Sequence, residues 1–168
     1  EQMAQLGEDR FRREIGCEFV INDETLIAPI KLLELEGIEP IRKSGQVRWY
    51  REPRPGEIYV VALDPSLGTG GDPAAIQVFE ASTTTQIGEW KHNKTDIPSQ
   101  VKLLAEICRY ISEKTGEPNN IYYSIECNGI GEAAIISLNE YGESNIPGIF
   151  ISEAGKGRKG FNTTNKSK

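Results

Sequence analysis

The chain has 168 residues, of which 38% are hydrophobic and 26% are charged, and its formal net charge is −6. This length and composition are typical of one globular domain with a sizeable core, and no apolar run approaches the roughly 20 residues that span a membrane. Three cysteines without CxxC spacing and a single histidine argue against a zinc site. The acidic balance argues against a surface that coats nucleic acid, although five basic residues and no acid follow Glu153.

The opening third of the chain, residues 1–57, is expected to form a linker subdomain outside the catalytic core. Asn22-Asp23 can cap a helix, and the segment that follows is predicted to be helical until Gly37, with a break or restart at Pro29. Two short extended pieces come next, separated by Ser44-Gly45 and closed by two prolines.

The stretch 58–72, IYVVALDPSLGTGGD, organises the rest of the chain. Its apolar, β-branched start predicts a buried strand over 58–64 that ends on an acid, Asp64. Three glycines then lead to a second acid, Asp72, and without a Cβ they allow the backbone to approach a metal or a phosphate. Each acid also has a simpler interpretation, in which Asp64 ends a turn and Asp72 caps the loop.

After this strand the pattern alternates between strands and helices. We expect strands at 74–80 and 86–91, a helix that starts at Thr95 or Asp96 with Pro98 in its first turn and ends at Gly116, a strand at 121–126, a helix from Asn128-Gly129 to about Glu140, and a short strand at 148–152. The order βββαβαβ predicts a mixed α/β sheet in which three antiparallel strands precede parallel strands joined by crossover helices.

Acids end the first and fourth of these strands, at Asp64 and Glu126. If the fourth strand lies beside the first, the two carboxylates meet at one edge of the sheet, where they repel each other unless a cation lies between them. Mg²⁺ and Mn²⁺ prefer such oxygen ligands, and two such ions can activate a water and stabilise the leaving oxygen of a phosphodiester. We interpret Asp64 and Glu126 as catalytic metal ligands and Asp72 as a further candidate ligand.

Three motifs in order resemble the nuclease part of the large terminase subunit of tailed bacteriophages: VVALDPSLGTGGDPAAI, IYYSIECNGIGEAA and the Gly/Lys/Thr-rich GKGRKGFNTTNK. The opening EDRFRREIGCEFV is similar to the stretch that joins the ATPase domain of that family to its nuclease. The resemblance implies an RNase H-like fold and metal-dependent cutting of concatemeric double-stranded DNA. It implies that Asp64 and Glu126 are the first and second metal ligands and that Asp72 matches an additional acid of some members.

The resemblance also implies cofactors, partners and a location. The cofactor would be Mg²⁺ or Mn²⁺ in a two-metal site. The partners would be double-stranded DNA, the ATPase domain of the same full-length protein, the portal and the small terminase subunit, in the host-cell cytoplasm and without a membrane. The basic segment would correspond to a mobile loop near the active site, and its candidate DNA-binding residues are Lys156, Arg158, Lys159 and Lys166.

Two features depart from the family pattern. Members carry a third essential acid on a later helix, whereas no acid follows Glu153 here, and they carry a phosphate loop in an N-terminal ATPase, whereas no GxxxxGK[ST] occurs here. We therefore expect residues 58–168 to be a nuclease domain that is incomplete at its C-terminus, joined through residues 1–57 to an ATPase domain that this chain lacks. We expect such a chain to bind metal weakly and to cut DNA poorly or not at all.

Two other functions fit the same residues. Actin-like ATPases and sugar kinases also place an acid and glycines after a first strand, and residues 64–70 fit their phosphate-binding loop, although the Asn-Gly after the fourth strand does not. Nucleotide-dependent thermal stabilisation would identify that function. The third possibility is a non-catalytic docking module whose acids bind an ion only for structural reasons.

Overall fold

The computed structural model describes residue 31 and residues 34–162. Most of the predicted helix after Asn22-Asp23 lies outside the described residues, as do Cys17 and Lys166. The chain divides into two compact units, Glu1–Ile38 and Glu39–Lys168, and the second contains both acids that end predicted strands.

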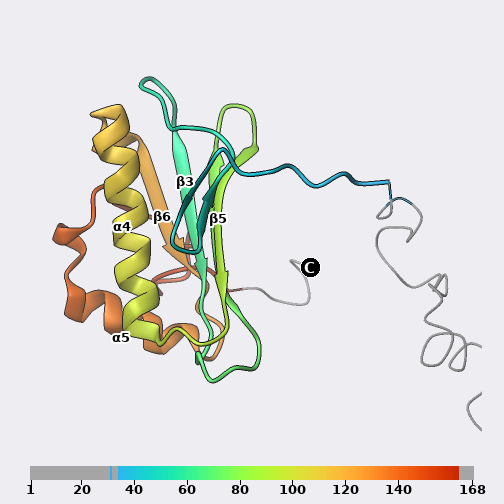
Figure 1. The fold of residues 1–168 in the computed structure, drawn as a ribbon. Coiled ribbons are helices and arrows are strands. Elements are labelled where there is room, and N and C mark those ends of the chain that lie inside the picture. The colour runs from blue at the N-terminus through green and yellow to red at the C-terminus, as the bar shows by residue number, and fades with distance from the viewer. Residues whose placement is uncertain (1–30, 32–33, 163–168) are drawn as a thin grey trace, which may run out of the picture. The chain divides into compact units, whose positions relative to one another are not determined.

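A mixed sheet forms the centre of the second unit (Figure 1). Within the described residues its strands are β1 (Arg42–Ser44), β2 (Val47–Trp49), β3 (Tyr59–Asp64), β4 (Ala74–Glu80), β5 (Thr85–His92), β6 (Ile121–Ile125) and β7 (Ile149–Phe150). Their order across the sheet is β1-β2-β5-β4-β3-β6-β7. In this order, neighbouring strands from β1 through β2, β5 and β4 to β3 are antiparallel. Strand β6 pairs parallel with both β3 and β7. The predicted mixed sheet and the order of its strands are confirmed, with bounds that differ by one or two residues.

The sheet also extends beyond the predicted start of the core at residue 58. The short β1–β2 hairpin turns at Gly45, and Trp49 of β2 pairs with Gly88 of β5. The Trp49 ring lies so close to this strand that a Cβ on Gly88 would be 2.9 Å from it. The ring also packs against Tyr110 in a tilted arrangement, with 4.7 Å between the centroids. Part of the stretch that we assigned to a linker therefore belongs to the sheet, and its linking role stays a prediction.

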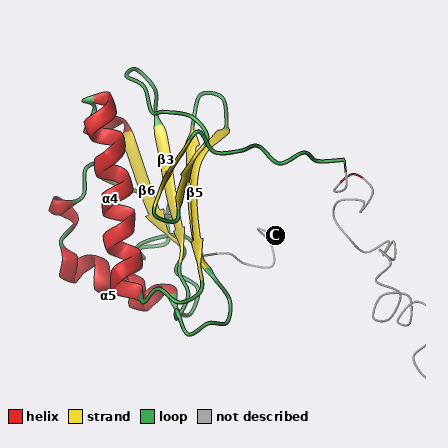
Figure 2. Ribbon diagram, in the orientation of Figure 1, coloured by secondary structure: helices red, strands yellow, loops and turns green. Residues whose placement is uncertain are grey.

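Two helices, α4 (Ile97–Thr115) and α5 (Gly131–Tyr141), lie on one side of the sheet (Figure 2), and two 3₁₀ turns, η1 (Pro118–Asn120) and η2 (Glu143–Asn145), follow them. As predicted, Asp96 caps α4 by accepting a hydrogen bond from the Ser99 N–H, Pro98 lies in the first turn, and the helix ends at Gly116. Its buried stripe includes Leu104 and Ile111. No helix of the described part is long and apolar enough to cross a membrane.

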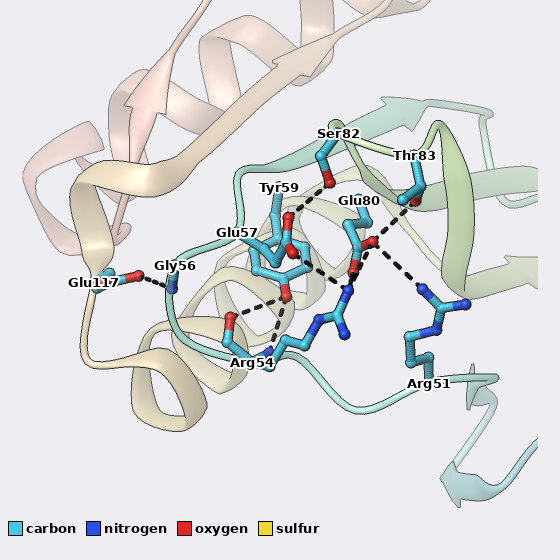
Figure 3. A network of polar contacts seen from close by, with 9 residues as sticks. All are labelled: Arg51, Arg54, Gly56, Glu57, Tyr59, Glu80, Ser82, Thr83 and Glu117. Atoms are coloured by element: carbon cyan, nitrogen blue, oxygen red, sulfur yellow. Dashed lines mark hydrogen bonds and ion pairs between the residues drawn. The ribbon is translucent and has the colours of Figure 1, made fainter.

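A polar network fastens the start of β3 to the end of β4 (Figure 3). The buried Glu80 carboxylate accepts hydrogen bonds from Arg54 at 3.2 Å, from Arg51 at 3.3 Å and from Thr83 at 2.9 Å. Burial opposes the ionisation of Glu80, yet the Thr83 hydrogen bond and the two arginine charges lower its pKa below the ordinary value. Tyr59 and Arg54 exchange hydrogen bonds as well. This end of β3 is thus fixed, and Asp64 ends the other.

Candidate metal site at the ends of β3 and β6

Asp64 and Glu126 lie side by side, as the sequence predicts. Asp64 is the last residue of β3, and Glu126 directly follows β6. The Glu126 N–H donates to the Leu63 carbonyl at 2.9 Å, which continues the parallel register by one residue. The Asp64 carboxyl group is hydrogen-bonded to Glu126. The two side chains therefore meet because parallel strands end at the same edge of a sheet.

The electrostatics of this pair are unfavourable without a cation. Although Asp64 is exposed as a residue, its pKa is raised to about 6. The largest cause is the partial withdrawal of its carboxyl group from water, and the hydrogen bond and the negative charge of Glu126 add to it. The Asn128 amide donates to one Glu126 oxygen at 2.9 Å and so fixes that carboxylate. The two adjacent carboxyl groups form a set of oxygen donors that attracts a divalent ion.

The pair opens on a cavity of about 500 Å³, on the face of the sheet that carries no helix in the described part. The cavity is lined by Val60, Ala62, Leu63, Asp64, Ala75, Gln77, Ser124, Ile125, Glu126, Ile151 and Phe161. None of these lining residues is basic, so no side chain of the cavity wall offsets the two carboxylates. The small residues around them leave room for a ligand.

The loop after Asp64 is held by a buried amide. Gln100, on the first turns of α4, is fully buried and donates from Nε2 to the carbonyl oxygens of Ser66 and Thr95, both at 2.7 Å. Its Oε1 accepts a longer hydrogen bond, of 3.3 Å, from the Ser66 N–H. Gln100 thereby fixes the backbone two residues after Asp64 and contributes to placing that carboxylate.

The glycines of this loop pack against the protein's own backbone. Gly68 has φ +70°, and a Cβ there would lie 2.1 Å from the Thr95 carbonyl oxygen. The Gly70 N–H donates to Asn93 O at 2.7 Å. The Gly68 N–H donates to the Ser66 hydroxyl at 3.4 Å. These two amides are therefore already engaged, which argues against the alternative in which the loop cradles a nucleotide phosphate.

Asp72 lies exposed near the far end of the same loop. Among the described residues there is no group of three or more histidines, cysteines or acids that could hold a metal ion, so Asp72 does not form such a group with Asp64 and Glu126. Its role as a ligand stays a prediction.

The basic segment near the C-terminus passes directly beside Glu126. Phe161 forms a parallel bridge with Glu126, and its carbonyl accepts the Cys127 N–H at 2.7 Å. The segment comes so close to β6 that a Cβ on Gly160 would lie 2.2 Å from Cys127 Sγ and 2.4 Å from the Ile125 carbonyl oxygen. Gly160 and Phe161 of this segment therefore lie next to the end of β6, and its role as a loop of the active site stays a prediction.

The cations of the segment have different surroundings. Lys156 forms an ion pair with Glu153 at 2.7 Å, and Lys159 pairs with Glu143. Arg158 lines a separate cavity of about 510 Å³ together with residues of α5. Contact of these residues with DNA stays a prediction, as it does for Lys166.

Sequence reasoning did not identify Gln100 or Phe161 as residues of the site. Gln100 shares its helical stripe with Leu104 and Ile111, so a polar residue in an apolar stripe was the available signal. Phe161 gave no signal, because its place in the cavity wall depends on the pairing of its segment with the end of β6.

No protein-family model matches the chain, and neither does any curated protein. Solved structures do match. The large terminase nuclease from thermophilic phage G20c with bound magnesium aligns with TM-score 0.51 and 20% identity over 71% of this chain and 57% of that one. A second structure of that nuclease gives TM-score 0.52 and 19% identity over 71% and 56%. The nuclease with bound cobalt gives 0.51 and 20% over the same shares.

The likeness is one of fold, and it confirms the predicted fold class, an RNase H-like mixed sheet. The chain spans little more than half the length of the nuclease that it matches.

Proposed function

We propose that this domain is a metal-dependent endonuclease of a phage DNA-packaging terminase and cuts concatemeric double-stranded DNA. The observation that carries the proposal is the Asp64–Glu126 pair, held at the adjacent ends of β3 and β6. The fold around the pair is shared with a large terminase nuclease that has been solved with magnesium and with cobalt.

The residues present fit a hard divalent cation such as Mg²⁺ or Mn²⁺. Asp64 and Glu126 offer carboxylate oxygens. The pKa of Asp64 is raised by its partial withdrawal from water and by Glu126, so its carboxylate form is disfavoured in a way that a bound cation would relieve. Two ions bound there would supply an activated water and stabilise the leaving oxygen of the phosphodiester. Because two acids, and no third, come together in the part of the chain that the structure describes, we expect weak binding and slow cutting.

The protein's own residues supply rigidity and orientation at this site. Asn128 holds one oxygen of Glu126, and Gln100 fixes the backbone after Asp64, so neither carboxylate needs to be ordered when substrate arrives. Asp72, at the end of the same loop, is the additional ligand in the proposal.

The wider role follows from the same proposal. Residues 1–57 would join the nuclease to the ATPase domain of the full-length protein, and the portal and small subunit would be its partners, in the host-cell cytoplasm. Lys156, Arg158, Lys159 and Lys166 would contact the substrate, with Lys156 and Lys159 exchanging Glu153 and Glu143 for DNA phosphates.

The test is a Mn²⁺ titration followed by electron paramagnetic resonance on the wild type and on Asp64→Asn, Glu126→Gln and Asp72→Asn. We expect the first two substitutions to weaken Mn²⁺ binding at least tenfold, because each removes one of two anionic ligands. Glu113→Gln changes an exposed acid on α4 and serves as the matched control.

Mn²⁺ binding that survives both Asp64→Asn and Glu126→Gln would overturn the proposed site. Cleavage of supercoiled plasmid with Mg²⁺ or Mn²⁺ then measures activity, and rapid cutting by the wild type would contradict the expected weakness of a two-acid site. A thermal shift with ATP and none with Mn²⁺ would favour the phosphate-loop alternative.

A further inference from the structure

The face of the sheet that carries Asp64 continues to the β1–β2 hairpin as an unbroken row of paired residues. Directly paired residues of neighbouring strands point to the same face. From β1 to β6 the row reads Lys43, Arg48, Glu89, Gln77, Ala62 and Ser124. The adjacent row pairs Lys91 with Ala75 and Ala75 with Asp64. Three cations therefore lie on the same face as the candidate metal site.

The orientation of this face follows from the tryptophans. Trp49 packs against Tyr110 of α4, and Trp90 is almost fully buried, so these side chains point toward the helices. Arg48 and Lys91, which alternate with them along β2 and β5, point the other way. The cations thus face away from the helices, as Asp64 does.

The three cations line one groove at the hairpin, of about 350 Å³, together with Gly45, Gln46 and Glu89. Glu89 is engaged by Arg48 at 3.2 Å and by the Tyr50 hydroxyl at 2.6 Å, and these contacts lower its pKa. Lys43 and Lys91 are exposed, and neither side chain has a hydrogen bond or an ion pair within the described residues. This groove is locally positive on a chain whose net charge is −6.

The spacing of the cations suits a nucleic-acid duplex. Neighbouring strands lie about 4.8 Å apart, so Lys91 is about 10 Å and Lys43 about 19 Å across the sheet from Asp64. The larger distance corresponds to roughly five or six base pairs at about 3.4 Å each. One duplex can therefore reach the hairpin and the two acids together.

We propose that Lys43, Arg48 and Lys91 bind the phosphate backbone of a double-stranded DNA segment that runs across the open face to Asp64 and Glu126. The proposal rests on the proposed function for the cutting at the acids, but the affinity of the cations for a duplex is measurable without metal and without cleavage. The groove and the candidate metal site lie on one face of the sheet, which favours DNA as the occupant, because a phosphodiester is what the metal site would act on. An acidic protein segment would be repelled by the two carboxylates and would gain nothing by extending to them.

The test is the affinity for a fluorescent 20-base-pair duplex by anisotropy, in EDTA, from 50 to 200 mM salt. We expect Lys43→Ala/Lys91→Ala to weaken binding at least fivefold at 50 mM salt. The slope of log affinity against log salt should decrease by about 2, because two phosphate contacts are lost. The matched control Lys102→Ala/Lys114→Ala removes the same charge from exposed lysines of α4 and should stay within twofold of the wild type.

Equal affinities of the two double variants would overturn the proposal, provided that their thermal unfolding shows both to be folded. If polyglutamate displaces the labelled duplex as effectively as unlabelled duplex does, DNA as the specific occupant of the groove would be overturned. Asp64→Asn separates this inference from the proposed function. If Asp64→Asn loses Mn²⁺ binding while Lys43→Ala/Lys91→Ala keeps the duplex affinity of the wild type, only the proposed DNA surface is overturned. If Asp64→Asn binds Mn²⁺ as the wild type does while Lys43→Ala/Lys91→Ala loses affinity for the duplex, only the proposed metal site is overturned.

Discussion

At neutral pH the folded chain holds the Asp64 carboxylate partly withdrawn from water and beside Glu126, and both effects cost free energy of folding. The pKa of Asp64 is about 6 in the folded chain, against an ordinary value of 3.8. The folded state therefore binds this proton more tightly than the unfolded state does. The stability that Asp64 contributes when protonated is fully present below about pH 4 and is lost as the pH rises through about 6.

Asp64→Asn should therefore stabilise the metal-free protein at neutral pH. We expect a gain of about 1 kcal/mol at pH 7.5, once solvent screening at this open site is allowed for, and a gain that largely disappears near pH 4. The measurement is urea denaturation in EDTA at pH 4, 5, 6 and 7.5. Asp72→Asn, an exposed acid of the same loop, is the control, and a wild type as stable as Asp64→Asn at pH 7.5 would contradict the expectation.

Individual residues of the site differ in how far sequence could identify them. Asp64 and Glu126 end apolar, β-rich runs, and that local signal was sufficient to select them. That they meet followed only if the fourth predicted strand lies beside the first, and the pairing of β3 with β6 meets that condition. One partner of Gln100, Ser66, lies on a loop 34 residues earlier, so the position of Gln100 in a helical stripe indicates burial but not what it binds. Lys43 and Lys91 reach one groove only through the register of β1, β2 and β5, which no local pattern encodes.

Among the elements, the loop between β3 and β4 shows most clearly what its glycines do. They were interpreted as room for a metal or a phosphate, yet the backbone that Gly68 approaches is that of Thr95. The loop is thus a packed connection that fixes the end of β3. Its effect on the candidate site is indirect, through the position of Asp64.

Gly68→Ala should destabilise the protein by about 2 kcal/mol or more. The φ of +70° is unfavourable for alanine, and the new Cβ would collide with the Thr95 carbonyl oxygen. Gly71→Ala is the matched control in the same loop, because nothing lies within 4 Å of a Cβ there and its φ is outside the left-handed region. Urea denaturation compares the two, and similar free energies of unfolding would show that the loop is not packed as described.

The elements β3 to β7, α4 and α5 were predictable because each carries a strong local period, a cap or a breaker. The β1–β2 hairpin was recognised only as two extended pieces. Its strands have three residues each, too short for an alternating pattern, and β2 pairs with β5 rather than with the strand that follows it in sequence. The hairpin joins the sheet through a non-local contact, the pairing of Trp49 with Gly88, in which the Trp49 ring packs against the glycine.

Across the whole molecule, β3 is anchored at one end and carries the candidate site at the other. Tyr59 pairs with Glu80 at the first residue of β3, and Asp64 pairs with Ala75 at the last. The Glu80 network ties the chain before β3 to the hairpin between β4 and β5. Stability and metal binding should therefore be separable by substitution.

Glu80→Ala should lower the free energy of unfolding by about 1–3 kcal/mol at pH 7. The side chains of Arg51 and Arg54 are 46% and 55% exposed, so they stay hydrated, which limits the loss. Because the pKa of Glu80 is lowered, its contribution is present at neutral pH and disappears as the pH falls below the ordinary carboxylate range. Thermal unfolding measures the effect.

Glu140→Ala, an exposed acid of α5, is the control for this substitution. Well below its unfolding temperature, Glu80→Ala should bind Mn²⁺ as the wild type does. A weakened Mn²⁺ affinity would show that the two ends of β3 are coupled.

The sheet ends on both sides in very short strands, three residues in β1 and two in β7. A strand at the rim of a sheet exposes unpaired amides and carbonyls, to which a strand of another molecule can add, and short, charged rims resist that association. Arg42 and Lys43 place two positive charges on the β1 rim, so two copies that approach rim to rim repel each other. The lysine that we assign to DNA therefore also lies on this rim, where its charge disfavours the addition of a strand from another molecule.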